Sequence, residues 1–311
     1  METVDIVKEP IIQNKKKKKY NMFRKEERIA YLFIAAPILQ FLVFMLGPMI
    51  FSVGASFTDW SGIGKMSFIG IKNYINLFND ANFWKSLFNT IFYFIGIPIG
   101  MILGLLLAMA LNRKIPGVRV FRTIYYIPVV SSAVAVSILW SWVYNSDYGL
   151  INGFLSVLGI KGPAWLSDPS TVKPALIGMF VWQGLGNTIV LYLAGLQGIS
   201  SVYYEAAAID GANAWHKFRH ITVPLITPTS FYLLVTNLIG GFQLYIPITI
   251  MTNDGGTNYS SATTVFYLFN KAFKDYQMGY ASAVAWILGF VILIVTIINF
   301  KFQDKWVNTM N

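Results

Sequence analysis

The sequence contains no cysteine and only two histidines, and just 12% of its 311 residues are charged. The lack of cysteine excludes disulfides, thiolate metal sites and cysteine nucleophiles. Soluble globular proteins have about 25% charged residues, so this chain has too little polar surface to cover a globule in water. Its 55% hydrophobic residues and mean hydropathy of +0.55 are typical of an integral membrane protein.

The few charges are placed so that six long windows contain none. Each window has at least 24 residues, and about 20 apolar residues in a helix suffice to cross a hydrocarbon layer of about 30 Å. The windows are residues 29–58, 86–112, 123–146, 174–204, 220–253 and 276–300. The sequence therefore predicts an all-α integral membrane protein with six transmembrane helices.

Lys and Arg are divided unequally between the two sides of the predicted spans. With the N-terminus inside, 17 of the 24 lie on the inner face. Since positive residues concentrate in cytoplasmic loops, we expect both termini to be cytoplasmic. The five lysines at residues 15–19 fit this orientation as a segment that anionic headgroups attract. The first apolar stretch is too long for a signal peptide, so we expect it to remain as a span.

This pattern gives a simple predicted organisation. Residues 1–29 form a basic cytoplasmic N-terminal tail, residues 30–300 the six-helix transmembrane domain, and residues 301–311 a cytoplasmic C-terminal tail. The loop over residues 197–222, between the fourth and fifth spans, belongs to the transmembrane domain.

That inner loop differs in composition from the rest of the chain. Ser201 can cap a helix, and Glu205 would complement the positive N-terminal end of that helix. The alanines at residues 206–208 favour its continuation. Gly211 then permits a turn, after which we expect a second short helix over about residues 212–221.

The second predicted helix carries an apolar ridge formed by Trp215, Phe218 and Ile221. Such a ridge fits a groove in a partner protein, although an amphipathic helix on the membrane surface would look similar. His216 and His220 are four residues apart, as in some metal pairs. No third ligand is evident, so we predict surface or interface histidines, no metal site and no catalytic residue.

Ten residues in and after this loop resemble a known pattern. It is the coupling loop of permease subunits of binding-protein-dependent ABC importers, of the carbohydrate-uptake (maltose and multiple-sugar) type. The matching residues are Glu205, Ala206, Ala207, Asp210, Gly211, Ala212, Phe218, Ile221, Pro224 and Pro228. Further phrases of this family lie at residues 56–60, 147–152, 163–168, 194–197 and 278–283. The resemblance covers most of residues 30–306.

The resemblance implies the type I importer permease fold and a mechanism that needs other subunits. In this family the coupling loop sits in a cleft of a cytoplasmic ATPase, whose closure on ATP drives two paired permeases from inward-facing to outward-facing. The implied ATPase-coupling residues are Glu205, Ala206, Ala207, Asp210, Gly211, Ala212, Trp215 and Phe218. Glu205 would pair with a basic residue of the ATPase, and Gly211 would set the angle between the two helices.

The expected partners follow from the same resemblance. They are a second, different permease, a cytoplasmic ATPase dimer, an extracellular solute-binding protein and a carbohydrate, in a bacterial plasma (inner) membrane. The sequence has no G-x-x-x-x-G-K-[ST] phosphate loop. We therefore expect no enzymatic activity and no cofactor in this chain, with ATP and Mg bound by the ATPase.

Neutral polar groups mark a possible substrate path. No charged residue lies in the middle of a span, which weighs against ion coupling and against a charged substrate held there by a fixed countercharge. Sugars suit amides beside aromatic faces. In maltose-type permeases the matching parts of the fourth and fifth spans contact sugar, which implies Trp182, Gln183, Gly184, Asn187, Asn237, Gly241 and Gln243. Interhelical hydrogen bonding by the amides, and close helix packing at the glycines, are the alternatives.

Other functions would leave different traces. An ABC permease for a non-sugar solute shares the coupling loop, so the sugar assignment depends on the longer matching phrases. A secondary transporter would take up its solute without ATP. A membrane enzyme would need catalytic groups clustered at one face, and the inner cluster offers no plausible nucleophile.

Overall fold

The computed structural model describes residues 27, 29–113 and 117–308. Within these residues the protein is helical, with one isolated β-bridge between Thr58 and Phe68 and no strand. The chain divides between Ala55 and Ser56 into two units, which are described separately. The lysines at residues 15–19, predicted to meet headgroups, lie outside the described residues.

The described part of the first unit is one apolar helix. The span Ile29–Ser56 contains it and ends at the first residue of the second unit. A π-helical turn, η1 (Leu42–Leu46), interrupts it just before α2 (Gly47–Ser56). Pro48 has no N–H, and its ring would crowd the carbonyl four residues earlier. The wide turn lets the Gly47 N–H donate to the Leu42 carbonyl five residues back. The helix thus accommodates the proline without breaking.

Six helices or helix pairs correspond to the six charge-free windows. By length and composition, the described residues contain four helices able to cross a membrane, or six spans if each of two bent pairs counts as one. The four are Ile29–Ser56, Ala81–Leu111, Val172–Gly198 and Met278–Gln303; the pairs are Val120–Val130 with Ala133–Val143 and Ala214–Leu225 with Thr227–Phe242. The predicted all-helical membrane fold is confirmed.

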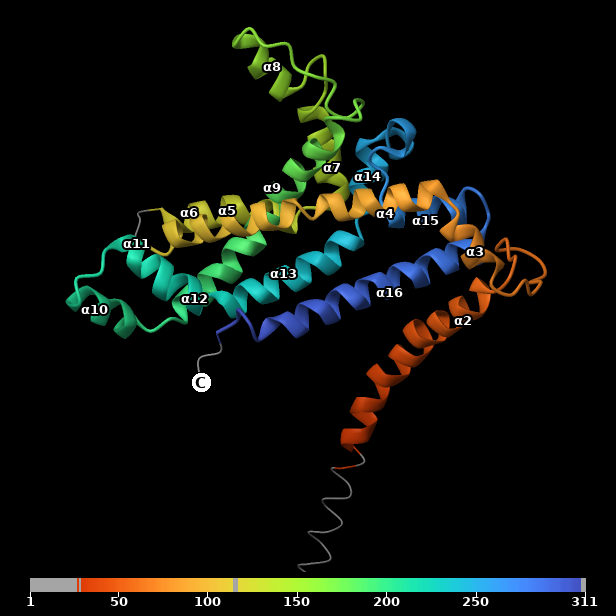
Figure 1. The fold of residues 1–311 in the computed structure, drawn as a ribbon, viewed down its shortest axis with the longest axis horizontal. Helices are drawn as coiled ribbons and strands as arrows, with labels where there is room; N and C mark the ends of the chain where they lie inside the picture. The colour runs from red at the N-terminus through yellow and green to blue at the C-terminus, as the bar shows by residue number, and fades with distance from the viewer. Residues whose placement is uncertain (1–26, 28, 114–116, 309–311) are drawn as a thin grey trace, which may run out of the picture. The chain divides into compact units, whose positions relative to one another are not determined.

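Figure 1 shows the helices of the second unit. In chain order they are α3 (Lys72–Phe78), α4 (Ala81–Tyr93), α5 (Gly96–Leu111), α6 (Val118–Val130), α7 (Ala133–Val143), α8 (Leu150–Val157), α9 (Val172–Gln197), α10 (Ser201–Ile209), α11 (Ala214–Lys217), η2 (Phe218–Thr222), α12 (Val223–Leu225), α13 (Thr227–Phe242), α14 (Ile246–Met251), η3 (Asn253–Gly255), η4 (Thr257–Tyr259), α15 (Thr264–Phe273) and α16 (Met278–Gln303).

The third span is sharply bent, by 103°. Pro128 is the residue in this span that would be expected to break a helix, yet the helix continues through it to Val130. The break falls at Ser131 and Ser132, both of which have non-helical backbone. The Ser132 side chain accepts a hydrogen bond from the Val134 N–H and so caps α7. Serine side chains that bond nearby backbone compete with the helix ladder, which explains a stop at this pair.

Helix α9 lies at the centre of the packing of the second unit, in contact with α5, α6 and α13. Its contact with α6 depends on Gly186, which is buried. A β-carbon there would lie 2.1 Å from the Tyr125 carbonyl oxygen and 2.7 Å from Val129 Cγ2. Close approach at small residues is how membrane helices gain van der Waals contact. Gly186 is therefore a helix-packing residue.

The two ends of the second unit carry different elements (Figure 1). Helices α10 and α11 extend beyond the ends of α5 and α13, whereas α3 and α15 lie at the other end. The C-terminal end of α16 is beside the first of these groups, since the Asn308 N–H donates to Thr227 Oγ1 at 2.9 Å and the Phe231 ring lies 5.2 Å from that of Phe300. The inner loop and the C-terminal segment thus share one end of the bundle, as the predicted topology requires.

Candidate functional site

The inner loop forms two helical arms joined by a turn, which we call the helix pair (α10 and the helix from α11 to α12). The first arm is capped one residue earlier than predicted. Ser200, with extended backbone, accepts a hydrogen bond from the Val202 N–H, and Ser201 is the first helical residue. An N-cap must have non-helical backbone, which Ser200 satisfies.

The turn between the arms depends on Gly211. Its φ is +78°, in the left-handed region that residues with a β-carbon resist. The Ala212 N–H then donates to the Ala207 carbonyl at 2.8 Å, which closes the C-terminal end of α10 in the manner of a Schellman motif. The predicted turn at this glycine is confirmed.

The second arm differs from the predicted helix over residues 212–221. Asn213 caps it, accepting from the His216 N–H at 2.8 Å, so the helix begins at Ala214. It changes to a π turn at Phe218 and continues through Pro224 to Leu225, because the Val223 N–H donates to the Phe218 carbonyl five residues back. The arm therefore runs into the fifth span, with a 58° bend before Thr227.

The residues implied in ATPase coupling lie at the surface of this pair. Glu205, Ala206, Asp210, Gly211 and Trp215 are exposed, and Ala207, Ala212 and Phe218 are half-buried. The Trp215 side chain is 64% exposed, and its ring lies 5.4 Å from that of Phe218. The predicted apolar ridge is shorter than expected, because Ile221 packs against the core. Two adjacent aromatic rings remain at the surface.

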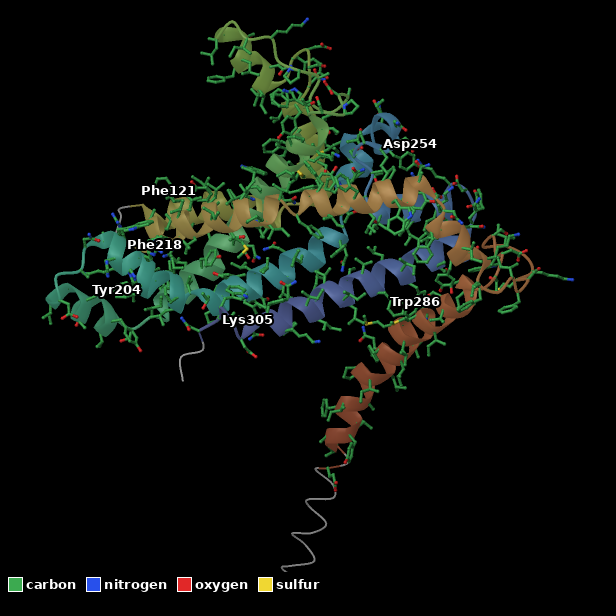
Figure 2. All side chains as sticks on the ribbon, in the orientation of Figure 1. Phe121, Tyr204, Phe218, Asp254, Trp286 and Lys305 are labelled. Atoms are coloured by element: carbon green, nitrogen blue, oxygen red, sulfur yellow. The ribbon has the colours of Figure 1, made fainter. Side chains whose placement is uncertain are left out.

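The two arms are tied together at their base, and the turn at Gly211 joins them at their tip. The hydroxyls of Tyr204 and Thr222 lie 3.0 Å apart (Figure 2 labels Tyr204). Toward Gly211 the arms enclose a recess of about 420 Å³. His216 and His220, which line it, are stacked with ring centroids 4.1 Å apart. Among the described residues, no group of three or more potential metal ligands is present.

A second recess lies within the bundle, among α4, α5, α9 and α13. Its volume is about 290 Å³, near the lower bound of about 300 Å³ for small-molecule sites. We call it the groove. Its walls combine two aromatic side chains with a few neutral polar ones, namely Tyr93, Phe180, Gln183, Thr188, Thr236 and Asn237. Such a lining suits a neutral hydroxylated ligand.

Four of the seven residues predicted on a substrate path line this groove: Gln183, Gly184, Asn237 and Gly241. The other three do not. Asn187 and Gln243 are exposed elsewhere, and Trp182 packs its ring 5.4 Å from that of Trp140.

The alternative role of the amides, interhelical bonding, is not observed in the described part of the chain. Asn237 donates to the Leu233 carbonyl of its own helix at 2.8 Å. Its Oδ1 atom and the Gln183 side chain make no hydrogen bond to another described residue. These amide groups are available to a ligand in the groove.

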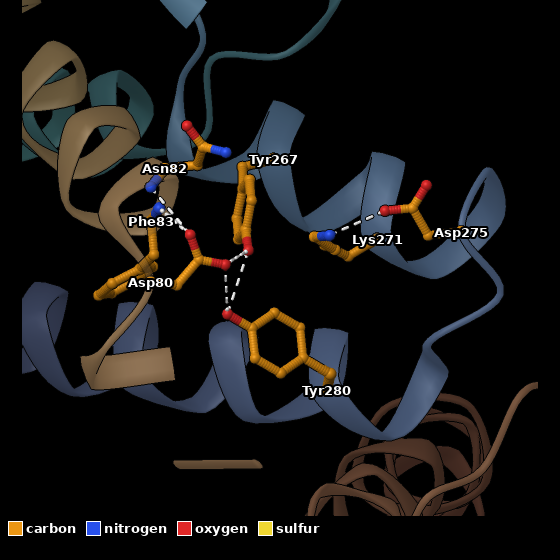
Figure 3. Close-up of polar contacts among 7 residues, drawn as sticks. All are labelled: Asp80, Asn82, Phe83, Tyr267, Lys271, Asp275 and Tyr280. Carbon is orange, nitrogen blue, oxygen red and sulfur yellow. Dashed lines mark hydrogen bonds and ion pairs between the residues drawn. The ribbon is translucent and has the colours of Figure 1, made fainter. Parts of the chain in front are cut away.

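The opposite end of the unit contains a polar cluster that the sequence did not suggest (Figure 3). Asp80 caps α4, accepting from the Asn82 N–H at 2.8 Å, and also accepts hydrogen bonds from the hydroxyls of Tyr267 in α15 and Tyr280 in α16. Its three partners come from positions up to 200 residues away. No local pattern marks such a contact, so only the fold brings these residues together.

Hydrogen bonds set the pKa of Asp80. Burial raises it, but the bonds from Tyr267, from the backbone N–H of Asn82 and from Tyr280 outweigh this effect and hold the pKa below its usual value. Burial and the bond to Asp80 raise the pKa of Tyr267. The carboxylate is therefore ionised and fixes the ends of three helices.

We expect Asp80→Asn to lower the melting temperature of the purified protein at neutral pH. A carboxylate whose pKa is lower in the folded state than in the unfolded state, where it is about 3.9, stabilises the fold fully when the pH is above the unfolded-state pKa. This stabilisation is lost as the pH falls through the folded-state pKa. The difference between wild type and variant should thus be constant above about pH 5 and shrink below about pH 3.9. Asp147→Asn, at an exposed carboxylate, is the matched control. A difference independent of pH down to complete acid unfolding would contradict this role.

Comparison with known proteins places the chain among membrane transport components. The family described as binding-protein-dependent transport system inner membrane component matches residues 96–307, which include α5, the helix pair, α16 and every groove residue except Tyr93. The match thus covers the recess of the helix pair and nearly all of the groove.

Individual relatives match over nearly the whole chain. The lactose transport system permease protein LacF of Rhizobium radiobacter is 35% identical over 277 residues, covering 87% of this chain and 92% of that protein. The arabinooligosaccharides transport system permease protein AraP of Bacillus subtilis is 34% identical over 289 residues, covering 92% of each.

A solved structure has the same fold. It is a chain of the bacterial alginate ABC transporter, crystallised in complex with a periplasmic protein bound to an alginate pentasaccharide. The TM-score is 0.81 and the identity 24%, with 92% of this chain and 97% of that chain covered. At this identity the likeness supports the arrangement of helices.

Proposed function

Because this chain belongs to the family of binding-protein-dependent transport system inner membrane components, we propose that it is the membrane-spanning permease subunit of an ATP-driven oligosaccharide importer. The carbohydrate class is supported by the lactose and arabinooligosaccharide permeases, each at least 34% identical to this chain. It is also supported by the groove, whose neutral amides and aromatic rings suit sugar hydroxyls and ring faces.

The observation that carries the proposal is the exposed helix pair. It protrudes at the end of the bundle that we assign to the cytoplasm, with Glu205 and Trp215 at its surface and Gly211 at its tip. Its second arm continues into the fifth span, which supplies part of the groove wall. A displacement of the pair by a partner would therefore be transmitted directly to the helix beside the substrate.

The chain would act as one part of a larger assembly. We assign ATP and Mg binding to a cytoplasmic ATPase dimer that receives the helix pair, since the sequence has no phosphate loop of its own. A second, different permease would complete the groove, and an extracellular solute-binding protein would deliver the sugar. Alternating access then consists of the groove facing first the binding protein and then the cytoplasm.

Reconstitution of the complete transporter in vesicles tests this function. The expected result is oligosaccharide uptake that requires both ATP and the solute-binding protein. Uptake of sugar without ATP would indicate a secondary transporter, whereas ATP-dependent uptake of a non-sugar solute alone would indicate a permease of another substrate class. Either outcome would contradict the proposal.

We expect Tyr204→Phe to weaken coupling without abolishing it. The variant loses the contact with Thr222 that ties the two arms, and one such hydrogen bond contributes about 1 kcal/mol. Sugar transported per ATP hydrolysed should fall by at most about fivefold, measured in vesicles. Tyr203→Phe is the control, because that exposed hydroxyl has no described partner. Equal effects of the two substitutions would show that the tie is not used.

A further inference from the structure

A lysine pair lies at the outer end of the seam between α4 and α9. Lys173, the second residue of α9, places its Nζ atom 3.2 Å from Asn89 Oδ1. The same ammonium lies over the Phe92 ring, 4.8 Å from its centroid, and 5.6 Å from that of Phe88. Lys85, one turn further out on α4, is close enough to repel it electrostatically.

This cation has no counter-ion within the described residues. The ion pairs found there are Lys271 with Asp275 and Lys274 with Asp254, and neither includes Lys85 or Lys173. Asp168, the nearest acid along the chain, accepts instead from the N–H and hydroxyl of Ser170. An ammonium has three N–H donors, and only one bond from Lys173, the one to Asn89, is described.

Helix stability does not explain a lysine at this position. A positive charge in the first turn of α9 opposes the helix dipole. Lysines near the end of a span usually extend toward the water, yet the Lys173 ammonium is turned toward Asn89, which is only 1% exposed. Asn89 in turn donates to the Tyr259 and Ala262 carbonyls of the outer loop, so its acceptor is held in place.

The seam leads from this cation to the groove. One turn inward from Phe92, a β-carbon on Gly96 would lie 3.2 Å from Ile177 and 3.5 Å from Val181. Gly96 and Val181 both line the groove. Val181 is eight residues beyond Lys173 on α9, a distance of about 12 Å along a helix. That span is comparable to a few sugar rings. The two helices are closely packed over it, so a ligand would meet the ammonium first and reach the groove only when the helices separate.

We propose that Lys173 and Lys85 bind the anionic groups of an acidic carbohydrate, carboxylate or sulfate, as it enters the groove. This inference rests on the proposed function and narrows its substrate class. The rings of Phe88 and Phe92 give apolar faces for sugar stacking, and the lysines give the charge. The neutral middle of the spans then lets the sugar pass without being held by a fixed countercharge.

Uptake by the complete reconstituted transporter tests the substrate class. The probes are trigalacturonate, sulfated galactotriose and neutral galactotriose, each with the solute-binding protein. We expect wild type to take up at least one acidic probe, and Lys173→Gln to raise the KM for it at least tenfold while leaving uptake of any accepted neutral probe unchanged. Lys173→Arg should retain the preference, and Lys161→Gln, at an exposed outer lysine, should match wild type.

Each other outcome has a distinct meaning. Uptake of neutral sugar alone, or an equal loss for neutral and acidic probes in Lys173→Gln, overturns the inference and leaves the importer function standing. An effect of Lys173→Gln that follows the phosphatidylglycerol content of the vesicles, regardless of the probe, assigns the lysines to a lipid headgroup and also overturns it. A transporter that takes up no carbohydrate contradicts the proposed function itself.

Discussion

Replacing Gly211 by aspartate is expected to abolish ATP-driven uptake while the protein still inserts and assembles its helices. Two effects combine at this residue. Its φ of +78° costs a residue with a β-carbon about 1–2 kcal/mol. The side chain would also place a charge at the tip of the helix pair, where we expect the ATPase to dock and where a buried, unpaired charge is costly.

Space around Gly211 does not limit the substitution, because a β-carbon added at this residue would have no other atom within 4 Å. This allows the two effects to be separated. Asparagine and aspartate tolerate the left-handed region to a similar degree, and asparagine carries no charge. Gly211→Asn should therefore retain much of the uptake, whereas Gly211→Ala reports the strain alone. The measurements are uptake in vesicles and protein abundance in the membrane. Full uptake by Gly211→Asp would refute a coupling role for the tip.

Two glycines of α9, two residues apart, should have different effects when each is replaced by leucine. At Gly186 a β-carbon would lie 2.1 Å from a backbone carbonyl of α6, so Gly186→Leu must separate the helices. Overpacking costs about 1–3 kcal/mol even where side chains can yield, and here the opposing atom is backbone. We expect the melting temperature of the purified protein to fall by on the order of 10 °C.

Gly184→Leu should fold normally and lose transport. No other atom lies within 4 Å of a β-carbon at Gly184, and the residue faces the groove. A leucine side chain would project into the recess of about 290 Å³ and narrow it. We expect uptake to fall at least tenfold with an unchanged melting temperature. If Gly184→Leu transports normally, the groove is not on the substrate path.

The membrane fold was predictable because it depends on composition over long windows. A charge is costly anywhere in hydrocarbon, so the six charge-free stretches identify the spans regardless of which apolar residue fills each position. The turn at Gly211 was predictable for a similarly local reason, since glycine is the residue that the left-handed region favours. These features need only the sequence neighbourhood of each residue.

Features that depend on distant contacts were not predictable in this way. Gly184 and Gly186 look alike in sequence, and only the position of Tyr125 on α6 distinguishes a packing glycine from one that faces the groove. Asp80 reads as a helix cap, while its bonds to Tyr267 and Tyr280 depend on the arrangement of three helices. The bend at Ser131 and Ser132 cannot be placed from the sequence, because Pro128, a stronger breaker, stands three residues earlier.

The π turns before Pro48 and Pro224 have a consequence for helical phase. Each residue of an α-helix advances the direction of its side chain by about 100°, and a π turn contains an additional residue. Compared with a regular α-helix over the same residues, the turn at Phe218–Thr222 therefore rotates Trp215 about the axis by roughly this amount. The direction of the aromatic tip thus depends on the π turn beside Pro224, and a change of that turn to regular α-helix would redirect the tip without altering any side chain that it presents.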